Sequence, residues 1–130
     1  MKEGLKYVLS KLTDAFNKLK EGVKTAEDEL EKDGVIQRFE FTFELLWKTL
    51  KIFLRENGIE TNTPKDSLKE AFRIGWLKEE NIFLNMLEDR NKSSHIYDKE
   101  TSEEIVNRVK NNYVPAIEEI LKKLEAKIKS

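Results

Sequence analysis

The feature that most constrains the fold is a long segment, residues 35–57, which is apolar on nearly every side. The piece 39–43 alternates as a β-strand would, but the whole run is too long for one strand and no turn signal interrupts it. We therefore expect a central helix that other helices cover on several sides. Its apolar residues are Val35, Ile36, Phe39, Phe41, Phe43, Leu45, Leu46, Trp47, Leu50, Ile52, Phe53 and Leu54.

The segments on either side of this run have clear helical signals. Residues 5–26 carry apolar residues at three- and four-residue steps, which is typical of an amphipathic helix with one buried stripe. We interpret Asp33 and Gly34 as the break before the central helix, with Asp33 as its N-cap. Gly58 is then the C-terminal stop of the central helix.

Two shorter helices are expected next. Thr63 is suited to cap a helix that has Pro64 at its first position, and Gly75 is suited to end it. Residues 78–90 place apolar side chains on one face and predict a fourth helix.

The last helix is predicted to begin with a capping box formed by Thr101 and Glu104. Pro115 lies inside it and should produce a kink, because proline removes one hydrogen bond and clashes with the preceding turn. The pattern predicts one all-α domain over residues 1–130. We expect an antiparallel bundle of about five helices, with a four-helix up-and-down core plus a short helix.

Composition excludes several kinds of site. The chain has no cysteine and one histidine, which rules out disulfides and thiolate metal sites, so we expect no metal and no cofactor. The net charge of −1 gives no overall positive field, so any contact with RNA must be local. No apolar run reaches membrane-spanning length and the N-terminus lacks a signal-peptide core, so we expect a cytoplasmic protein without membrane contact.

Polar residues interrupt the central helix. Glu40, Glu44 and Lys48 are four residues apart and share one face. This face is either a solvated stripe of paired charges or the wall of a cleft or dimer interface. The two carboxylates are a weak indication of a divalent ion, because such pairs are common on helix surfaces.

The stretch "MLEDRNKSSHIYDKET" places Arg90 five residues before His95, the single histidine, and Tyr97 two residues after it. On an unbroken helix, residues five apart point roughly 140° away from each other. Their convergence therefore needs the helix to end or bend between them, or a second copy of the chain. The intervening Asn-Lys-Ser-Ser favours such a turn.

The chemistry of this cluster suits phosphate esters. Neutral imidazole accepts a proton and imidazolium donates one, while guanidinium holds phosphate oxygens with a planar fork. Arg90 and His95 are thus a minimal set for cleaving RNA without metal, with Lys92 adding phosphate affinity. One histidine cannot be acid and base at once, unless a two-fold dimer brings two together. The alternative is an exposed turn between helices with an ordinary surface ion pair.

Two segments together, "DGVIQRFEFTFELLWKTLK" and "MLEDRNKSSHIYDKETSEEI", resemble the HEPN-type proteins called nucleotidyltransferase substrate-binding proteins. These are small helical chains encoded beside a minimal nucleotidyltransferase. The resemblance covers nearly the whole chain. Arg90, His95 and Tyr97 match the family motif, and Asn91 fills the polar position after the arginine.

The resemblance implies a homodimer in which two motifs meet in a cleft. It implies a toxin of a toxin–antitoxin pair, a metal-independent endoribonuclease with catalytic Arg90 and His95. Asn91 and Lys92 would contact the RNA. The partner nucleotidyltransferase, the antitoxin, would attach AMP to Tyr97. An older interpretation of such proteins makes the chain a non-catalytic substrate-binding subunit of a two-component nucleotidyltransferase.

Overall fold

The computed structural model describes residues 2–93 and 98–129, and all regular secondary structure within these ranges is helical. The last three segments run on without a break as one long helix, which gives five helices in the described chain. The predicted all-α bundle is therefore confirmed. In chain order the elements are α1 (Lys2–Thr25), α2 (Glu29–Glu56), α3 (Pro64–Arg73), α4 (Glu80–Ser93), α5 (Lys99–Arg108), the π-helical turn η1 (Val109–Tyr113) and α6 (Val114–Lys129).

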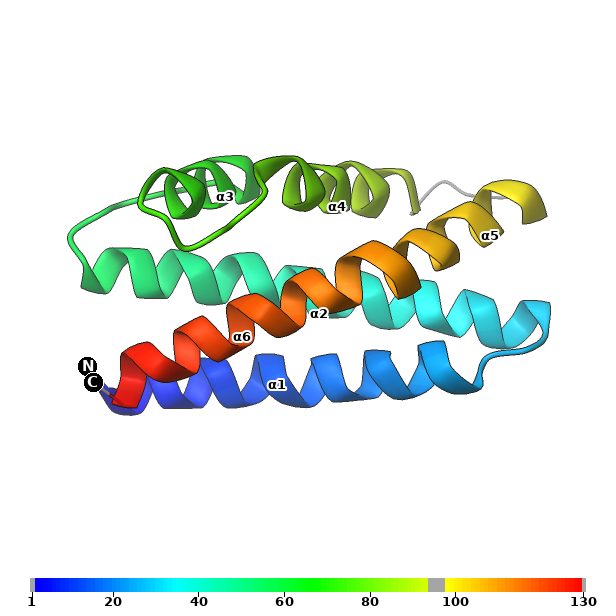
Figure 1. Ribbon diagram of the computed structural model, residues 1–130, viewed down its shortest axis with the longest axis horizontal. Coiled ribbons are helices and arrows are strands. Elements are labelled where there is room, and N and C mark those ends of the chain that lie inside the picture. Colours follow the sequence, from blue (N-terminus) through cyan, green and yellow to red (C-terminus); the bar gives the residue numbers. More distant parts are fainter. Residues whose placement is uncertain (1, 94–97, 130) are drawn as a thin grey trace.

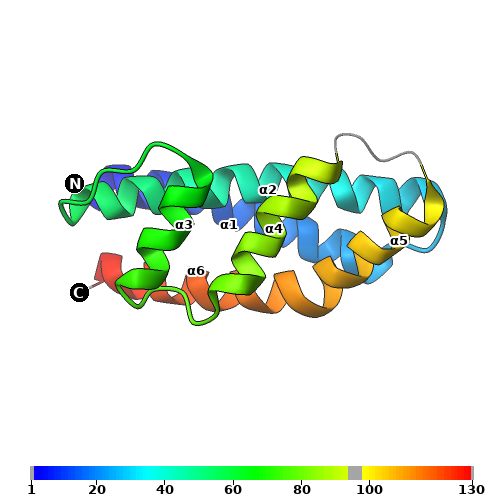
Figure 2. The same ribbon diagram turned by 90° about the horizontal axis from the view of Figure 1, so that it is seen from above.

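Three long rods run along the long axis of the molecule: α1, α2 and the continuous helix from α5 to α6 (Figure 1). α1 and α2 are antiparallel, and both ends of the chain lie at the same end of the bundle (Figure 1). α3 and α4 lie over α2 on the side away from α1 and cross the long axis obliquely (Figure 2). α4 thereby takes the place of the fourth helix of the bundle.

α2 is the central helix, as its sequence predicts. It contacts α1, α3, α4 and α5, so its apolar side chains are covered from several directions. One of the expected apolar residues is not covered, because the side chain of Phe41 is 62% exposed. The buried residues of α2 are Val35, Ile36, Phe39, Thr42, Phe43, Leu46, Thr49, Leu50, Phe53 and Leu54.

The predicted start of α2 at Asp33 is wrong. The N-cap is Asp28, whose carboxylate accepts a hydrogen bond from the Glu31 backbone at 2.8 Å. The Glu31 carboxylate accepts in return from the Asp28 backbone at 3.1 Å, which completes a capping box. Asp33 and Gly34 therefore lie inside the helix, where burial of the following Val35 stabilises the turn that glycine weakens.

The predicted limits of α3 are confirmed. The Thr63 hydroxyl accepts a hydrogen bond from the Asp66 backbone at 3.1 Å, and Pro64 occupies the first helical position. Gly58 and Gly75, which follow α2 and α3, have φ angles of +80° and +86°. Few residues other than glycine adopt such angles, which explains both helix ends.

The predicted capping box of Thr101 and Glu104 is wrong, because α5 begins one turn earlier. Its N-cap is Asp98, whose carboxylate accepts from the Thr101 backbone at 2.7 Å and from the Thr101 hydroxyl at 2.8 Å. The backbone hydrogen bond, followed by the hydroxyl one, lowers the pKa of Asp98. Thr101 therefore donates the capping hydrogen bonds, and Asp98 is the N-cap.

The last helix changes its hydrogen-bond pattern immediately before Pro115, where a kink is predicted. At the end of η1 the Val114 N–H donates to the Val109 carbonyl, five residues back instead of four. Proline has no N–H to donate, and its ring clashes with the carbonyl four residues earlier. The wider π turn accommodates the ring, so the helix continues through the proline to Lys129.

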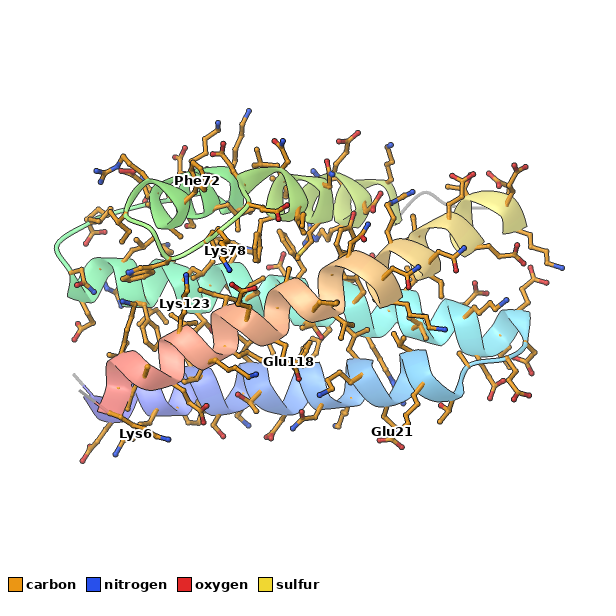
Figure 3. The ribbon with its side chains drawn as sticks, viewed as in Figure 1. Lys6, Glu21, Phe72, Lys78, Glu118 and Lys123 are labelled. Carbon is orange, nitrogen blue, oxygen red and sulfur yellow. The ribbon has the colours of Figure 1, made fainter. Side chains whose placement is uncertain are left out.

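An ion pair also joins α1 and α6, the first and last helices of the chain. Glu118 of α6 points toward α1 (Figure 3), and its carboxylate lies 2.9 Å from the Lys20 Nζ. The hydrogen bond from Lys20 lowers the pKa of Glu118. Both side chains are more than two-fifths exposed, so this pair adds little to the stability of the bundle.

Two glycine substitutions test where α2 begins and ends. A Cβ at Gly34 or at Gly58 would meet no atom within 4 Å, so only the backbone conformation distinguishes the two positions. Gly34→Ala should raise the free energy of unfolding by roughly 0.5–1 kcal/mol, since Gly34 is helical. Gly58→Ala should lower it by about 1 kcal/mol, since its φ is positive. Urea denaturation measures both, and destabilisation by Gly34→Ala would show that α2 does not run through this residue.

Candidate functional site

Arg90 lies in the last turn of α4, where this helix crosses α2 (Figure 2). Its Nη2 donates to the Glu44 Oε1 of α2 at 2.5 Å. The Arg90 side chain is 37% exposed, so the guanidinium is held in place while part of it still faces solvent. The described geometry is that of a partly exposed ion pair between two helices.

The two carboxylate oxygens of Glu44 contact two different basic side chains. Oε1 accepts from Arg90, and Oε2 lies 3.3 Å from the Lys48 Nζ one helical turn further along α2. The interpretation as a solvated stripe of paired charges is confirmed for Glu44 and Lys48, and a cleft or dimer interface at this face stays a prediction. Lys48 forms the expected i,i+4 surface pair, and Glu44 also reaches across to the predicted site residue on α4.

Asn91 and Lys92, the predicted RNA contacts, are both exposed. The Asn91 Oδ1 accepts a long hydrogen bond of 3.5 Å from the Arg90 Nη1. Lys92 pairs with Glu88 one turn earlier on α4, at 3.4 Å, and more than half of each side chain is exposed. An ion pair this exposed is weak, so a phosphate could displace Glu88 from Lys92.

His95 and Tyr97 lie outside the described residues. α4 is described as far as Ser93, and the next described residue is Asp98, the N-cap of α5. The structure therefore places Arg90 and its neighbours, while the convergence of Arg90 with His95 stays a prediction.

A buried carboxylate next to Arg90 is a feature that our sequence analysis missed. Asp89 is 4% exposed and accepts two hydrogen bonds of 2.8 Å from the Nε and Nη2 of Arg108. The Tyr113 hydroxyl donates a third hydrogen bond to the same carboxylate. One signal was available in the sequence, because Asp89 stands three residues after the buried Met86 and so continues the inner face of α4.

The Asp89 cluster also changes the acid–base behaviour of its members. Burial raises the pKa of Tyr113, and the hydrogen bond to Asp89 raises it further. The same carboxylate, through its hydrogen bonds, raises the pKa of Arg108. Both shifts favour the neutral phenol and the charged guanidinium, which are the forms that can donate to Asp89.

The local charge around Arg90 is nearly balanced. Each of the three cations described above has a carboxylate beside it: Glu44 serves Arg90 and Lys48, and Glu88 serves Lys92. A phosphate group at Arg90 must therefore compete with Glu44. This competition lowers the affinity of Arg90 for a phosphate group.

Two further observations concern the described ranges only. Residues 2–93 and 98–129 bring together no group of three or more His, Asp or Glu side chains that would hold a metal ion. None of the helices in these ranges combines the length and the apolar character needed to cross a bilayer.

Comparison with known proteins identifies similar chains. The model of the family described as "Nucleotidyltransferase substrate binding protein like" matches residues 7–126. A stretch of 72 residues is 38% identical to "Probable ribonuclease HepT" from Haemophilus influenzae and covers 52% of this chain. The match spans 49% of that protein, about half its length.

Two solved structures have a similar fold. A crystal structure from Thermus thermophilus matches with a TM-score of 0.81 and 36% sequence identity, covering 87% of this chain and 98% of that one. A structure from Haemophilus influenzae is described as revealing the fold of a substrate binding domain of a nucleotidyltransferase. It matches with a TM-score of 0.75 and 26% identity, covering 90% of this chain and 98% of the other.

The raised pKa of Tyr113 predicts a loss of stability in alkaline solution. Because the folded pKa lies above the unfolded value of about 10, the stabilisation is complete below pH 10 and is lost as the pH rises above it. Tyr113→Phe should remove this pH dependence, whereas the exposed Tyr7→Phe should behave as the wild type. Urea denaturation between pH 8 and 11 measures the effect. Parallel curves for the wild type and Tyr113→Phe would contradict it.

Proposed function

Because the chain belongs to the nucleotidyltransferase substrate binding protein-like family, we propose that it works beside a nucleotidyltransferase and is itself a metal-independent endoribonuclease. The observation that carries this proposal is the Arg90 guanidinium, held at the surface by Glu44 and five residues before the single histidine. The likeness to a protein named as a probable ribonuclease supports the same activity.

In the proposed reaction, His95 removes the proton from a ribose 2′-hydroxyl. The 2′-oxygen then bonds to the adjacent phosphorus, and the bond from phosphorus to the 5′-oxygen breaks. The departing 5′-oxygen takes up a proton from a second histidine, and Arg90 stabilises the charge on the phosphoryl oxygens. The products are a 2′,3′-cyclic phosphate and a 5′-hydroxyl.

The second proton-transfer group requires a second chain. The sequence has one histidine, which cannot be base and acid in the same step. A homodimer with two-fold symmetry supplies two histidines and two arginines to one cleft. Asn91 and Lys92 are exposed on the same helix end as Arg90, and we propose that they hold neighbouring phosphates of the RNA.

The partner nucleotidyltransferase is proposed to act as an antitoxin that modifies Tyr97. The Tyr97 hydroxyl releases its proton to solvent and its oxygen bonds to the α-phosphorus of ATP. The bond from that phosphorus to the bridging oxygen breaks, pyrophosphate leaves, and AMP stays attached to the side chain. The added group brings bulk and negative charge two residues from His95, so it opposes the binding of RNA. This scheme makes the chain the toxin of a toxin–antitoxin pair in the cytoplasm.

A non-catalytic role is the second candidate. The Haemophilus influenzae structure is described as a substrate binding domain of a nucleotidyltransferase, which favours a subunit that presents a substrate to its partner. In that case the Arg90 turn is a docking or modification segment. Cleavage of RNA by the isolated chain distinguishes the two candidates.

RNA cleavage in EDTA is the first test of the proposed activity. The unmodified wild type, with its intact mass recorded, should cleave single-stranded RNA, and Arg90→Ala and His95→Ala should each lower the rate by about 100-fold or more. Arg73→Ala is the matched control, because Arg73 makes a similar 2.5 Å ion pair with Glu70 on α3 and is 61% exposed. Its rate should equal that of the wild type. No cleavage by the unmodified wild type would favour the non-catalytic subunit.

The mass of the particle in solution tests the need for two chains. Light scattering at micromolar concentration should give twice the chain mass of 15.3 kDa. His95→Ala chains added in excess should inhibit the wild type, because each mixed dimer carries one histidine and the mechanism needs two. A monomeric mass for an active sample would contradict the two-histidine mechanism.

A further inference from the structure

Asp89 is the last buried side chain of α4 in the described chain. After it, Arg90 is half-buried and Asn91 and Lys92 are exposed. The apolar contacts that hold α4 on the bundle therefore finish at Met86 and Leu87, before the turn that carries the candidate site. Among the described contacts, the hydrogen bonds of Asp89 fix this last turn to the interior.

The partners of Asp89 are themselves firmly placed. Tyr113 is 1% exposed, and its ring stacks on Phe39 of α2 with a centroid distance of 5.4 Å. Arg108 ends α5 and donates to both oxygens of Asp89, a two-point contact that fixes direction as well as distance. Two residues of the long helix, Arg108 and Tyr113, therefore hold the Asp89 carboxylate, and Tyr113 is itself packed against α2.

The π turn explains how two residues of one helix reach the same carboxylate. Arg108 and Tyr113 are five positions apart, which in a regular α-helix would place them roughly 140° apart. In η1 the hydrogen bonds join residues five apart, so side chains at this spacing lie close to one face. Pro115, which favours the π turn, thereby helps to assemble the Asp89 cluster.

We propose that Asp89, Arg108 and Tyr113 are positioning residues for Arg90. They fix the last turn of α4 against η1 with Asp89 pointing inward. Successive residues of a helix point about 100° apart, so a fixed Asp89 aims Arg90 at the α2 surface beside Glu44. The inference rests on the proposed function in one respect, because its kinetic effects require that Arg90 acts on RNA.

The test combines kinetics with a direct signal from Arg90. Asp89→Asn should lower kcat for RNA cleavage by about 100-fold, and Tyr113→Phe by about tenfold, with KM changed by less than about twofold. In ¹⁵N-labelled protein the Arg90 Nε–Hε resonance, assigned by its loss in Arg90→Ala, should move in both variants. The Arg73 resonance, from another paired surface arginine, should stay in place.

Ser67→Ala is the matched control for a loss of stability alone. It removes a buried hydrogen bond of 2.8 Å, between the hydroxyls of Thr61 and Ser67, that touches neither Arg90 nor the Asp89 cluster. It should leave kcat and the Arg90 resonance unchanged. A kcat loss in Ser67→Ala equal to that in Tyr113→Phe would overturn the proposal, because the loss would then follow stability.

The Arg90 resonance also separates this inference from the proposed function. If the wild type cleaves no RNA, the proposed activity fails, and the resonance alone decides whether the cluster positions Arg90. An unmoved resonance in folded Asp89→Asn or Tyr113→Phe overturns the inference whatever the RNA result. Should Asp89→Asn not fold, Tyr113→Phe, which keeps the ring in the core, carries the test.

Discussion

The fold depends on covering one helix that is apolar almost all round. α2 carries ten buried residues, and α1, α3, α4 and α5 all contact it. Burying a large apolar side chain contributes about 1.5–3 kcal/mol, so the apolar residues among these ten supply a large share of the driving force for folding. The other helices do not cover Phe41, which is exposed. Glu44 is partly exposed where α4 crosses α2.

The candidate site is a consequence of that crossing. Arg90 and Glu44 are 46 residues apart in sequence and meet because α4 lies over α2. Two neighbouring residues of α4 then point in different directions: Asp89 turns inward to Arg108 and Tyr113, and Arg90 turns toward the surface. A buried carboxylate is costly unless it is paired and hydrogen-bonded, and this one accepts three hydrogen bonds in the same cluster.

The sequence predicts the parts of this fold that follow from local rules. Helical periodicity located the helices, and Thr63, Gly58 and Gly75 marked ends that backbone geometry dictates. The predicted N-cap at Asp33 was wrong because the adjacent glycine resembles a helix break. The actual N-cap is Asp28, and packing of the following residues keeps Gly34 in the helix. The Asp89 cluster could not be predicted from spacing, because it needs a π turn and a contact between α4 and the last helix.

The chemistry of the new RNA ends tests the central claim most directly. Mass spectrometry of the fragments released by the unmodified chain in EDTA identifies those ends. Attack by the 2′-hydroxyl, with proton transfer by histidine and charge stabilisation by Arg90, predicts a 2′,3′-cyclic phosphate and a 5′-hydroxyl. Fragments that carry a 5′-phosphate and a 3′-hydroxyl would show that water and not the 2′-hydroxyl is the nucleophile, and would contradict the proposed mechanism.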